Sequence, residues 1–126
     1  MTQEDINKIS TLGLAHVGDG VYELLTRTYL CELGITTVVA LHRETVARVN
    51  ARSQAKAAAK ILPLLTDRER EVYKRGRNAH VNSVPKGAEL SEYHAATGLE
   101  ALFGWLYLGE EHGRIEELFT AITEEE

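Results

Sequence analysis

Residues 14–23 read Leu14-Ala15-His16-Val17-Gly18-Asp19-Gly20-Val21-Tyr22-Glu23, which sets one acid between two glycines in an otherwise apolar run. A second stretch near the other end, Thr97-Gly98-Leu99-Glu100-Ala101-Leu102-Phe103-Gly104, has a similar composition. Carboxylates are seldom buried unless they are paired or bind a cation. The two stretches therefore predict two helices that pack together and bring Asp19 and Glu100 into one shared metal site.

Apolar residues recur at helical spacing along most of the chain. We expect helical segments over residues 12–33, 36–62, 66–76, 90–108 and 114–122. Gly34 has the position of a helix C-cap, Asn50 marks a point where two helices meet, and Thr66 with Glu69 forms a capping box. No segment shows the alternation with a period of two that is typical of strands. The sequence predicts a single all-α domain over residues 1–126.

Glycines in the first expected helix carry a cost that needs an explanation. Gly18 and Gly20 would each cost about 1 kcal/mol relative to alanine in a helix interior. Close approach of another backbone would explain both, and would also explain Gly98 and Gly104. The expected core residues are Leu14, Val17, Val21, Leu24, Leu25, Leu33, Val38, Val39, Leu41, Val46, Val49, Ile61, Leu62, Leu99, Leu102, Phe103 and Leu106.

Positive charge is concentrated in the middle of the chain. Residues 43–86 carry 11 of the 14 Lys and Arg residues but only 4 of the 19 Asp and Glu residues, a net charge of +7. The rest of the chain carries −12. An asymmetry of this size indicates a basic face for a polyanionic partner.

Two parts of this segment are candidates for phosphate contact. A basic stripe with four-residue spacing is formed by Arg48, Arg52, Lys56 and Lys60. Such a row also fits a solvated helix face, but acidic partners four positions away are scarce, which favours phosphate contact. Residues 75–87 have the glycine, asparagine and proline content of a functional loop. This loop adds Arg75, Arg77 and Lys86 to the candidates.

Several function classes are disfavoured by composition. A single cysteine excludes an intramolecular disulfide, and the five histidines lack the spacing of zinc ligands. The acidic amino terminus has no signal-peptide pattern, and no apolar run reaches the ~20 residues of a membrane span. No strand followed by a glycine-rich turn provides a phosphate-binding loop. We expect a cytoplasmic protein without membrane association.

The acids that remain suit metal-assisted chemistry. Mg²⁺ is often held by one or two carboxylates and keeps several waters, so Asp19 and Glu100, with Glu23 nearby, suffice for a site beside a phosphate. Hydrolysis of a phosphodiester fits this layout. The alternative is structural: Glu100 pairs with an arginine, and Asp19 makes a helix-terminal hydrogen bond. Spacing alone leaves both interpretations open.

These residues also carry a resemblance to a known family. Residues 14–23 resemble the signature helix of the ribonuclease III catalytic domain, and residues 100–104 are similar to its second acidic segment. Arg75-Gly76-Arg77-Asn78-Ala79, followed by Val84-Pro85-Lys86, is similar to the central loop of the small branch, Mini-ribonuclease III. The resemblance covers about residues 9–122. It leaves no room for a double-stranded-RNA-binding domain, whose absence defines that branch.

The resemblance implies an all-helical, homodimeric endoribonuclease that cuts double-stranded RNA with Mg²⁺, with one site in each subunit. It implies that Asp19 and Glu100 are catalytic and bind the metal. RNA contact is then expected from Arg48, Arg52, Lys56, Arg75, Arg77 and Lys86. The implied substrate is the precursor of large-subunit ribosomal RNA, with ribosomal protein L3 as an assisting partner.

The chain departs from the full-length family at three positions. Ala15 stands where that family has a glutamate and Thr97 where it has an aspartate, so we expect more water ligands on the metal. His16 replaces an aromatic residue of the family's dimer interface. Two alternatives follow: a catalytically silent RNA-binding or ribosome-assembly module, and an all-α nucleotide pyrophosphohydrolase. The second tends to carry paired acidic motifs, which Asp19 and Glu100 do not form.

Overall fold

The computed structural model describes residues 1–79 and 89–124, and every regular element in those two ranges is helical. The elements are α1 (Gln3–Asn7), α2 (Thr11–Glu32), α3 (Val38–Val49), α4 (Ala51–Ile61), the 3₁₀ turn η1 (Leu62–Leu64), α5 (Asp67–Arg77), α6 (Leu90–Leu108) and α7 (His112–Thr123). The prediction of an all-α domain is confirmed.

Local capping chemistry sets the predicted helix ends. Gly34 follows α2 with a φ of 94°, a conformation that favours glycine. Asn50 is extended between α3 and α4, and its Oδ1 accepts a hydrogen bond from the backbone of Ser53. Thr66 and Glu69 form the expected capping box at the start of α5. The two-helix interpretation of residues 36–62 is therefore confirmed.

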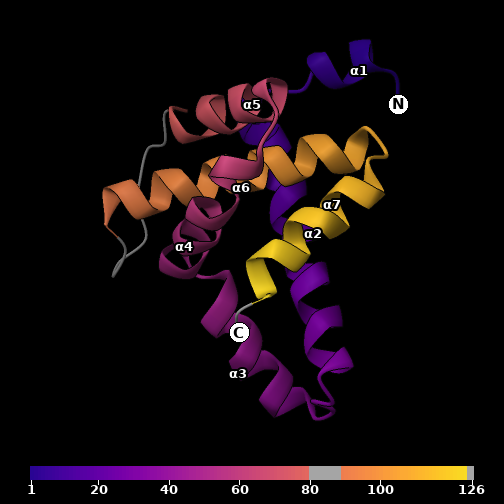
Figure 1. Cartoon of the computed structure of the whole chain (residues 1–126), viewed down its shortest axis with the longest axis vertical. Coiled ribbons are helices and arrows are strands. Elements are labelled where there is room, and N and C mark those ends of the chain that lie inside the picture. Colours follow the sequence, from indigo (N-terminus) through magenta and orange to yellow (C-terminus); the bar gives the residue numbers. More distant parts are fainter. Residues whose placement is uncertain (80–88, 125–126) are drawn as a thin grey trace.

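Helix α6 lies at the centre of the molecule. Figure 1 shows it crossing the middle, with α5 along one side and with α2 and α4 packed against it elsewhere. Leu99, Leu102 and Phe103 of α6 are completely buried. The ring of Tyr22 on α2 meets the ring of Phe103 edge to face, with 5.4 Å between centroids. The two acidic stretches thus belong to the helices that build the core.

Backbone contact between α2 and α6 depends on two glycines. A Cβ atom on Gly18 would overlap the carbonyl oxygen of Glu100, and one on Gly104 would overlap that of Leu14. Gly98 is also crowded, though less severely, because a Cβ there would lie 2.8 Å from atoms of Tyr73 in α5. The close-approach prediction is confirmed for these three glycines. It is wrong for Gly20, because nothing lies within 4 Å of the position of its Cβ.

Some residues expected in the core are on the surface. The exposed ones are Leu24 (66%), Leu33 (56%), Val38 (79%), Val39 (73%) and Val46 (51%). Helix α3 packs along the far half of α2, which extends away from α6 (Figure 1). The outer sides of both helices therefore have no neighbouring element in the described part of the chain, whatever their apolar content.

Within residues 1–79 and 89–124, no helix has the length and apolarity needed to cross a lipid bilayer.

We expect Gly18→Ala to lower the free energy of unfolding by about 1–3 kcal/mol or more, because the new methyl group forces α2 away from α6. Gly113→Ala in α7 is the control, because Gly113 also lies inside a helix but outside the packed centre of the molecule. It should be neutral or stabilising by up to about 1 kcal/mol, because its added methyl group has no neighbour within 4 Å among the described residues. Urea denaturation at one protein concentration measures both. Equal destabilisation by the two variants would contradict the proposed role of Gly18.

Candidate active site

Asp19 of α2 and Glu100 of α6 lie against each other, although 81 positions separate them in the sequence. Burial, the charge of Asp19 and a hydrogen bond between the two carboxyl groups, in that order of size, together raise the pKa of Glu100 from 4.5 to about 8. The protonated Glu100 donates that hydrogen bond to Asp19. The sequence prediction that these two acids meet is therefore supported by the structure.

The structural alternative for these acids does not hold. Among the residues that the structure describes, neither Asp19 nor Glu100 forms an ion pair with a basic side chain, so no arginine neutralises Glu100. Two carboxyl groups in contact favour either a shared proton or a bound cation, because both cannot ionise freely at this distance. The pair thus has the chemistry of a cation site.

A third polar group at the site is Gln54 of α4, which sequence reasoning missed. Its side chain is 2% exposed, and its amide favours the ionised form of Glu100, lowering the pKa of this carboxyl group against the stronger effect of burial. One feature of the sequence could have indicated Gln54. It is the single polar residue on the inner face of residues 51–61, where the other buried residues are alanine and isoleucine.

The two family carboxylates that this chain lacks are replaced by residues that do not contribute an acid. Ala15 is 6% exposed and packs in an apolar cluster with Leu14 and Ala101. The hydroxyl of Thr97 donates to the carbonyl oxygen of Tyr93, 3.0 Å away on the same helix. Both positions therefore serve packing or local hydrogen bonding.

Glu23 was expected as a further candidate ligand. It is half-exposed, and its Oε2 lies 2.9 Å from a guanidinium nitrogen of Arg27 on the same helix. No three His, Cys, Asp or Glu side chains cluster closely enough to hold a metal in residues 1–79 and 89–124. The donor set that the structure brings together is thus one carboxylate pair, which fits a hard cation that keeps most of its waters.

The predicted basic stripe is divided between two helices. Asn50 ends α3, so Arg48 lies on α3, while Arg52, Lys56 and Lys60 lie on α4. Arg48 pairs with Glu44 at 3.0 Å, and Arg52 approaches Glu92 of α6 at 3.4 Å. The expectation of one basic stripe along a single helix face is therefore wrong, and Arg48 and Arg52 each have an acidic partner.

The two lysines of α4 differ in their surroundings. The Nζ atom of Lys60 donates to the carbonyl oxygen of Ile122 at 2.9 Å, which ties α4 to α7. Lys56 is exposed and has no ion-pair partner among the described residues. Within this helix, Lys56 is the more accessible positive charge.

The expected loop over residues 75–87 begins later than predicted, because Arg75, Gly76 and Arg77 form the last turn of α5. Gly76 packs against Gly98 and Ala101 of α6, and this contact continues the helix past its predicted end. Residues 80–88, including Lys86, lie outside the described part of the chain. Arg77 lies 6.0 Å from the centre of the Tyr73 ring.

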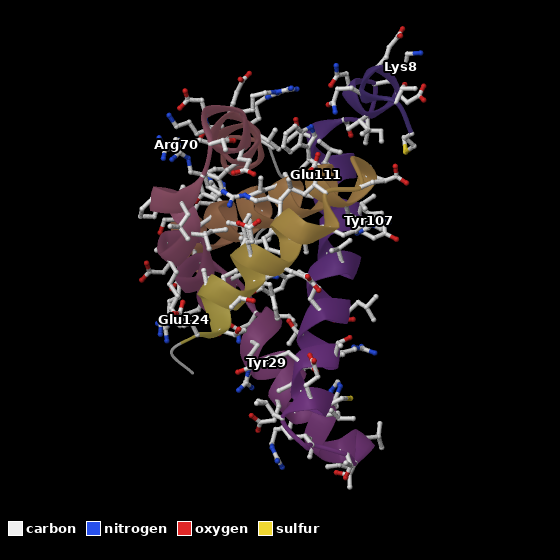
Figure 2. All side chains as sticks on the ribbon, turned by 45° about the vertical axis from the view of Figure 1, so that its right-hand side comes forward. Lys8, Tyr29, Arg70, Tyr107, Glu111 and Glu124 are labelled. Carbon is white, nitrogen blue, oxygen red and sulfur yellow. The ribbon has the colours of Figure 1, made fainter. Side chains whose placement is uncertain are left out.

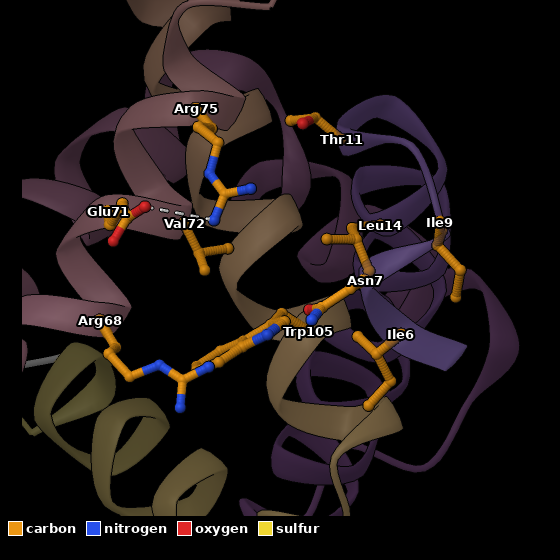
Figure 3. A pocket seen from close by; sticks show the side chains of 10 residues that line it. All are labelled: Ile6, Asn7, Ile9, Thr11, Leu14, Arg68, Glu71, Val72, Arg75 and Trp105. Carbon is orange, nitrogen blue, oxygen red and sulfur yellow. Dashed lines mark ion pairs between the residues drawn. The ribbon is translucent and has the colours of Figure 1, made fainter. Parts of the chain in front are cut away.

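Arg75 lies at a different place from Arg77. It lines a cavity of about 290 Å³ between α1, α2, α5 and α6, where it pairs with Glu71 at 3.6 Å (Figure 3). Arg68 covers the indole ring of Trp105 in the same cavity, at 5.6 Å from the ring centre. Neither Asp19 nor Glu100 lines this cavity. The structure thus separates Arg75 from the carboxylate pair.

The helical fold with one carboxylate pair between two core helices defines a class of protein. The family model described as "Ribonuclease III domain" matches residues 12–111. The chain belongs to the ribonuclease III family. Enzymes of this family generally depend on a divalent metal, act on double-stranded RNA and usually form dimers.

Individual relatives narrow this assignment to the small branch of the family. A "Mini-ribonuclease 3" of Thermoanaerobacter sp. (strain X514) is 42% identical over 94% of this chain and 83% of the relative. One from Symbiobacterium thermophilum is 43% identical over 87% of this chain and 85% of its own. A crystal structure of a protein from Fusobacterium nucleatum superposes with a TM-score of 0.86 at 31% identity, covering 95% and 96% of the two chains. The resemblance to Mini-ribonuclease III and the prediction of an endoribonuclease are confirmed.

In metal-free buffer, we expect the free energy of unfolding to fall as pH rises from 4.5 to about 8, by up to about 1.4 kcal/mol per pH unit. Folded Glu100 keeps its proton up to about pH 8, whereas the unfolded side chain loses it near 4.5, so unfolding releases a proton between these values. Stability contributed by this group is thus lost as pH rises through the window.

The measurement is a series of urea titrations in EDTA from pH 5 to 8, with Glu100→Gln as the control. Subtracting the variant removes the contribution of the other titrating groups, including Glu69, whose pKa is lowered. Parallel pH profiles for the two proteins would show that the pKa of Glu100 is not raised.

Proposed function

We propose that this endoribonuclease uses Mg²⁺ to hydrolyse phosphodiester bonds of double-stranded RNA, with Asp19 and Glu100 as its catalytic metal ligands. The observation that carries the proposal is the contact between these two carboxyl groups, which no basic side chain neutralises in the described residues. A divalent cation held by Asp19 and Glu100 would replace the shared proton and relieve the repulsion of two ionised acids.

A bound Mg²⁺ supplies an activated water and stabilises charge on the phosphoryl group. The side chains of this chain hold and orient that ion. Asp19 approaches from α2 and Glu100 from α6, and the Gly18 contact fixes the spacing between these helices. Since Ala15 and Thr97 offer no carboxylate, water would supply the remaining ligands. Glu23 is a candidate for an outer contact through one of those waters.

RNA contact is proposed for the basic residues predicted from the sequence. Arg52 and Lys56 are exposed on α4, and Arg52 reaches Glu92 of α6, the helix that carries Glu100, so we place the phosphate backbone along this exposed side of α4. Arg48 and Arg77 extend this surface from α3 and from the end of α5. The separate position of Arg75 makes it the weakest candidate of the set. Lys86 stays a prediction outside the described residues.

A homodimer would present two such sites, one for each RNA strand. An apolar groove of about 440 Å³ lies between α2, α6 and α7 and is lined by Val17, Leu24, Tyr107 and Ile115, among others. Figure 2 shows Tyr107 beside α2 at this groove. The groove lies beside α2, the helix that carries Asp19. A second subunit bound in this groove would therefore bring the carboxylate pairs of the two subunits close together.

The substrate we propose is the precursor of large-subunit ribosomal RNA, processed in the cytoplasm, with ribosomal protein L3 as the assisting partner. A-form RNA is recognised by its shape, its phosphates and its 2′-hydroxyl groups, which suits a basic surface without a base-reading pocket. The nucleotide pyrophosphohydrolase alternative has little support, because residues 1–79 and 89–124 hold no cluster of three acids.

We expect Asp19→Asn to lower kcat on duplex RNA by at least about 10³-fold, because an amide no longer contributes charge to the metal site. Binding of the duplex should be nearly unchanged, because phosphate contacts dominate affinity. Cleavage is measured with a long duplex RNA in Mg²⁺ and in EDTA, and binding by titration in EDTA.

Glu32→Gln is the matched control on the same helix, and it should retain full activity because Glu32 is exposed at the far end of α2. Loss of binding together with cleavage in Asp19→Asn would remove Asp19 from the chemistry. Wild-type protein that binds duplex RNA in Mg²⁺ without cutting it would instead support the catalytically silent module.

We expect Arg77→Ala to weaken duplex binding and to reduce the slope of log Kobs against log salt concentration by about 1, as for one lost phosphate contact. Lys8→Ala is the control, since Lys8 is an exposed cation at the outer end of the α1 region (Figure 2). An unchanged slope for Arg77→Ala would show that Arg77 does not touch phosphate.

A further inference from the structure

Gln54 has a polar group that packing does not explain. It faces the core from the middle of α4, where its buried neighbours are Ala57, Ala58 and Ile61. The side chain is 2% exposed, which is rare for glutamine. Leucine or methionine would fill a position of this size without a polar atom. The fold alone therefore gives no reason for an amide here.

The amide is also incompletely satisfied. Its Nε2 atom is buried and has no hydrogen-bond partner of acceptable geometry among the described residues. Buried donors almost always find a partner, because an unpaired one loses its hydrogen bonds to water without replacement. An orphaned donor at this depth indicates that a group which completes it belongs to another state of the site.

An acceptor of suitable chemistry beside Gln54 is the carboxyl group of Glu100. Gln54 interacts with its carboxyl group, although the approach does not reach the geometry of a full hydrogen bond. In the structure, Glu100 directs its hydrogen bond toward Asp19 instead. A cation between Asp19 and Glu100 would remove that hydrogen bond and free the carboxylate to rotate.

The geometry points to Gln54 as a positioning residue, whose Nε2 donates to one oxygen of the Glu100 carboxylate and thereby aims the other oxygen at the cation. The inference rests on the metal site proposed above. Hydrogen bonds from a neighbouring group fix the orientation of a metal-binding carboxylate, and their loss typically costs about 10–100-fold in metal affinity or activity.

The alternative is that Gln54 is a structural residue whose Nε2 binds a buried water. Such waters satisfy buried polar atoms in many proteins. The two roles differ in what an apolar replacement does. A structural glutamine supports folding, whereas a positioning glutamine tolerates replacement in stability but not in metal binding.

The test uses Gln54→Leu and Gln54→Met, which keep the volume and remove the donor. We expect both to unfold at the same temperature as the wild type or higher, because they delete an unsatisfied buried donor. We expect the Kd for Mn²⁺, measured by electron paramagnetic resonance without RNA, to rise about 10–100-fold. With RNA, kcat at fixed Mg²⁺ should fall and KM for the duplex should stay unchanged.

Thr26→Val is the matched control, because Thr26 is also buried and polar, but its hydroxyl already donates to the carbonyl oxygen of Tyr22 at 2.8 Å. It should leave the Kd for Mn²⁺ unchanged. Gln54 variants that lose stability yet bind Mn²⁺ and cleave as the wild type does would overturn the positioning role.

A further control separates this inference from the proposed function. If wild type binds Mn²⁺ and cuts duplex RNA, and Asp19→Asn abolishes both, the metal site stands and only the role of Gln54 is decided by its variants. If wild type neither binds Mn²⁺ nor cuts, the metal site and the role of Gln54 both fail.

Discussion

The backbone contact between α2 and α6 is the constraint on which the rest of the structure depends. Gly18 and Gly104 let the two helices approach so closely that each glycine lies against a backbone carbonyl of the other helix. No residue with a Cβ atom fits at either position. This approach places Asp19 against Glu100 and buries the centre of α6. The same glycines that lower intrinsic helix propensity therefore create both the core and the site.

Ionising Glu100 costs free energy in the folded protein, and the surrounding residues offset only a small part of that cost. Burial and the nearby charge of Asp19 hold the pKa of Glu100 at about 8, so the folded metal-free protein keeps a proton that the unfolded chain would release. A polar environment, such as an arginine partner, would have stabilised the ionised form. The described residues provide only the amide of Gln54, and this absence of a fixed counter-charge is what makes a bound cation favourable.

The sequence predicted the helices and their caps from periodicity and turn chemistry. It predicted the meeting of Asp19 with Glu100 from the rarity of acids in apolar stretches, although Asp19 is exposed and Glu100 is only partly buried. It could not predict which apolar residues remain exposed. Val38 and Val39 have the spacing of a core face, but α3 packs along a part of α2 that extends beyond α6. Gln54 was missed because its role depends on a contact between α4 and α6, and no local sequence pattern indicates that contact.

The chain has two carboxylates at this site, with Ala15 and Thr97 at the other two positions, and this number agrees with the cost of placing acids close together. Ala15 is packed among apolar residues and Thr97 uses its hydroxyl within α6, so a carboxylate at either position would be buried beside a pair that already shares one proton. Each added charge would raise the cost of the metal-free fold. With two carboxylates, the proposed divalent cation would neutralise the site completely. Since water would then supply the other ligands, the orientation of each carboxylate would have a larger influence on how the ion is held.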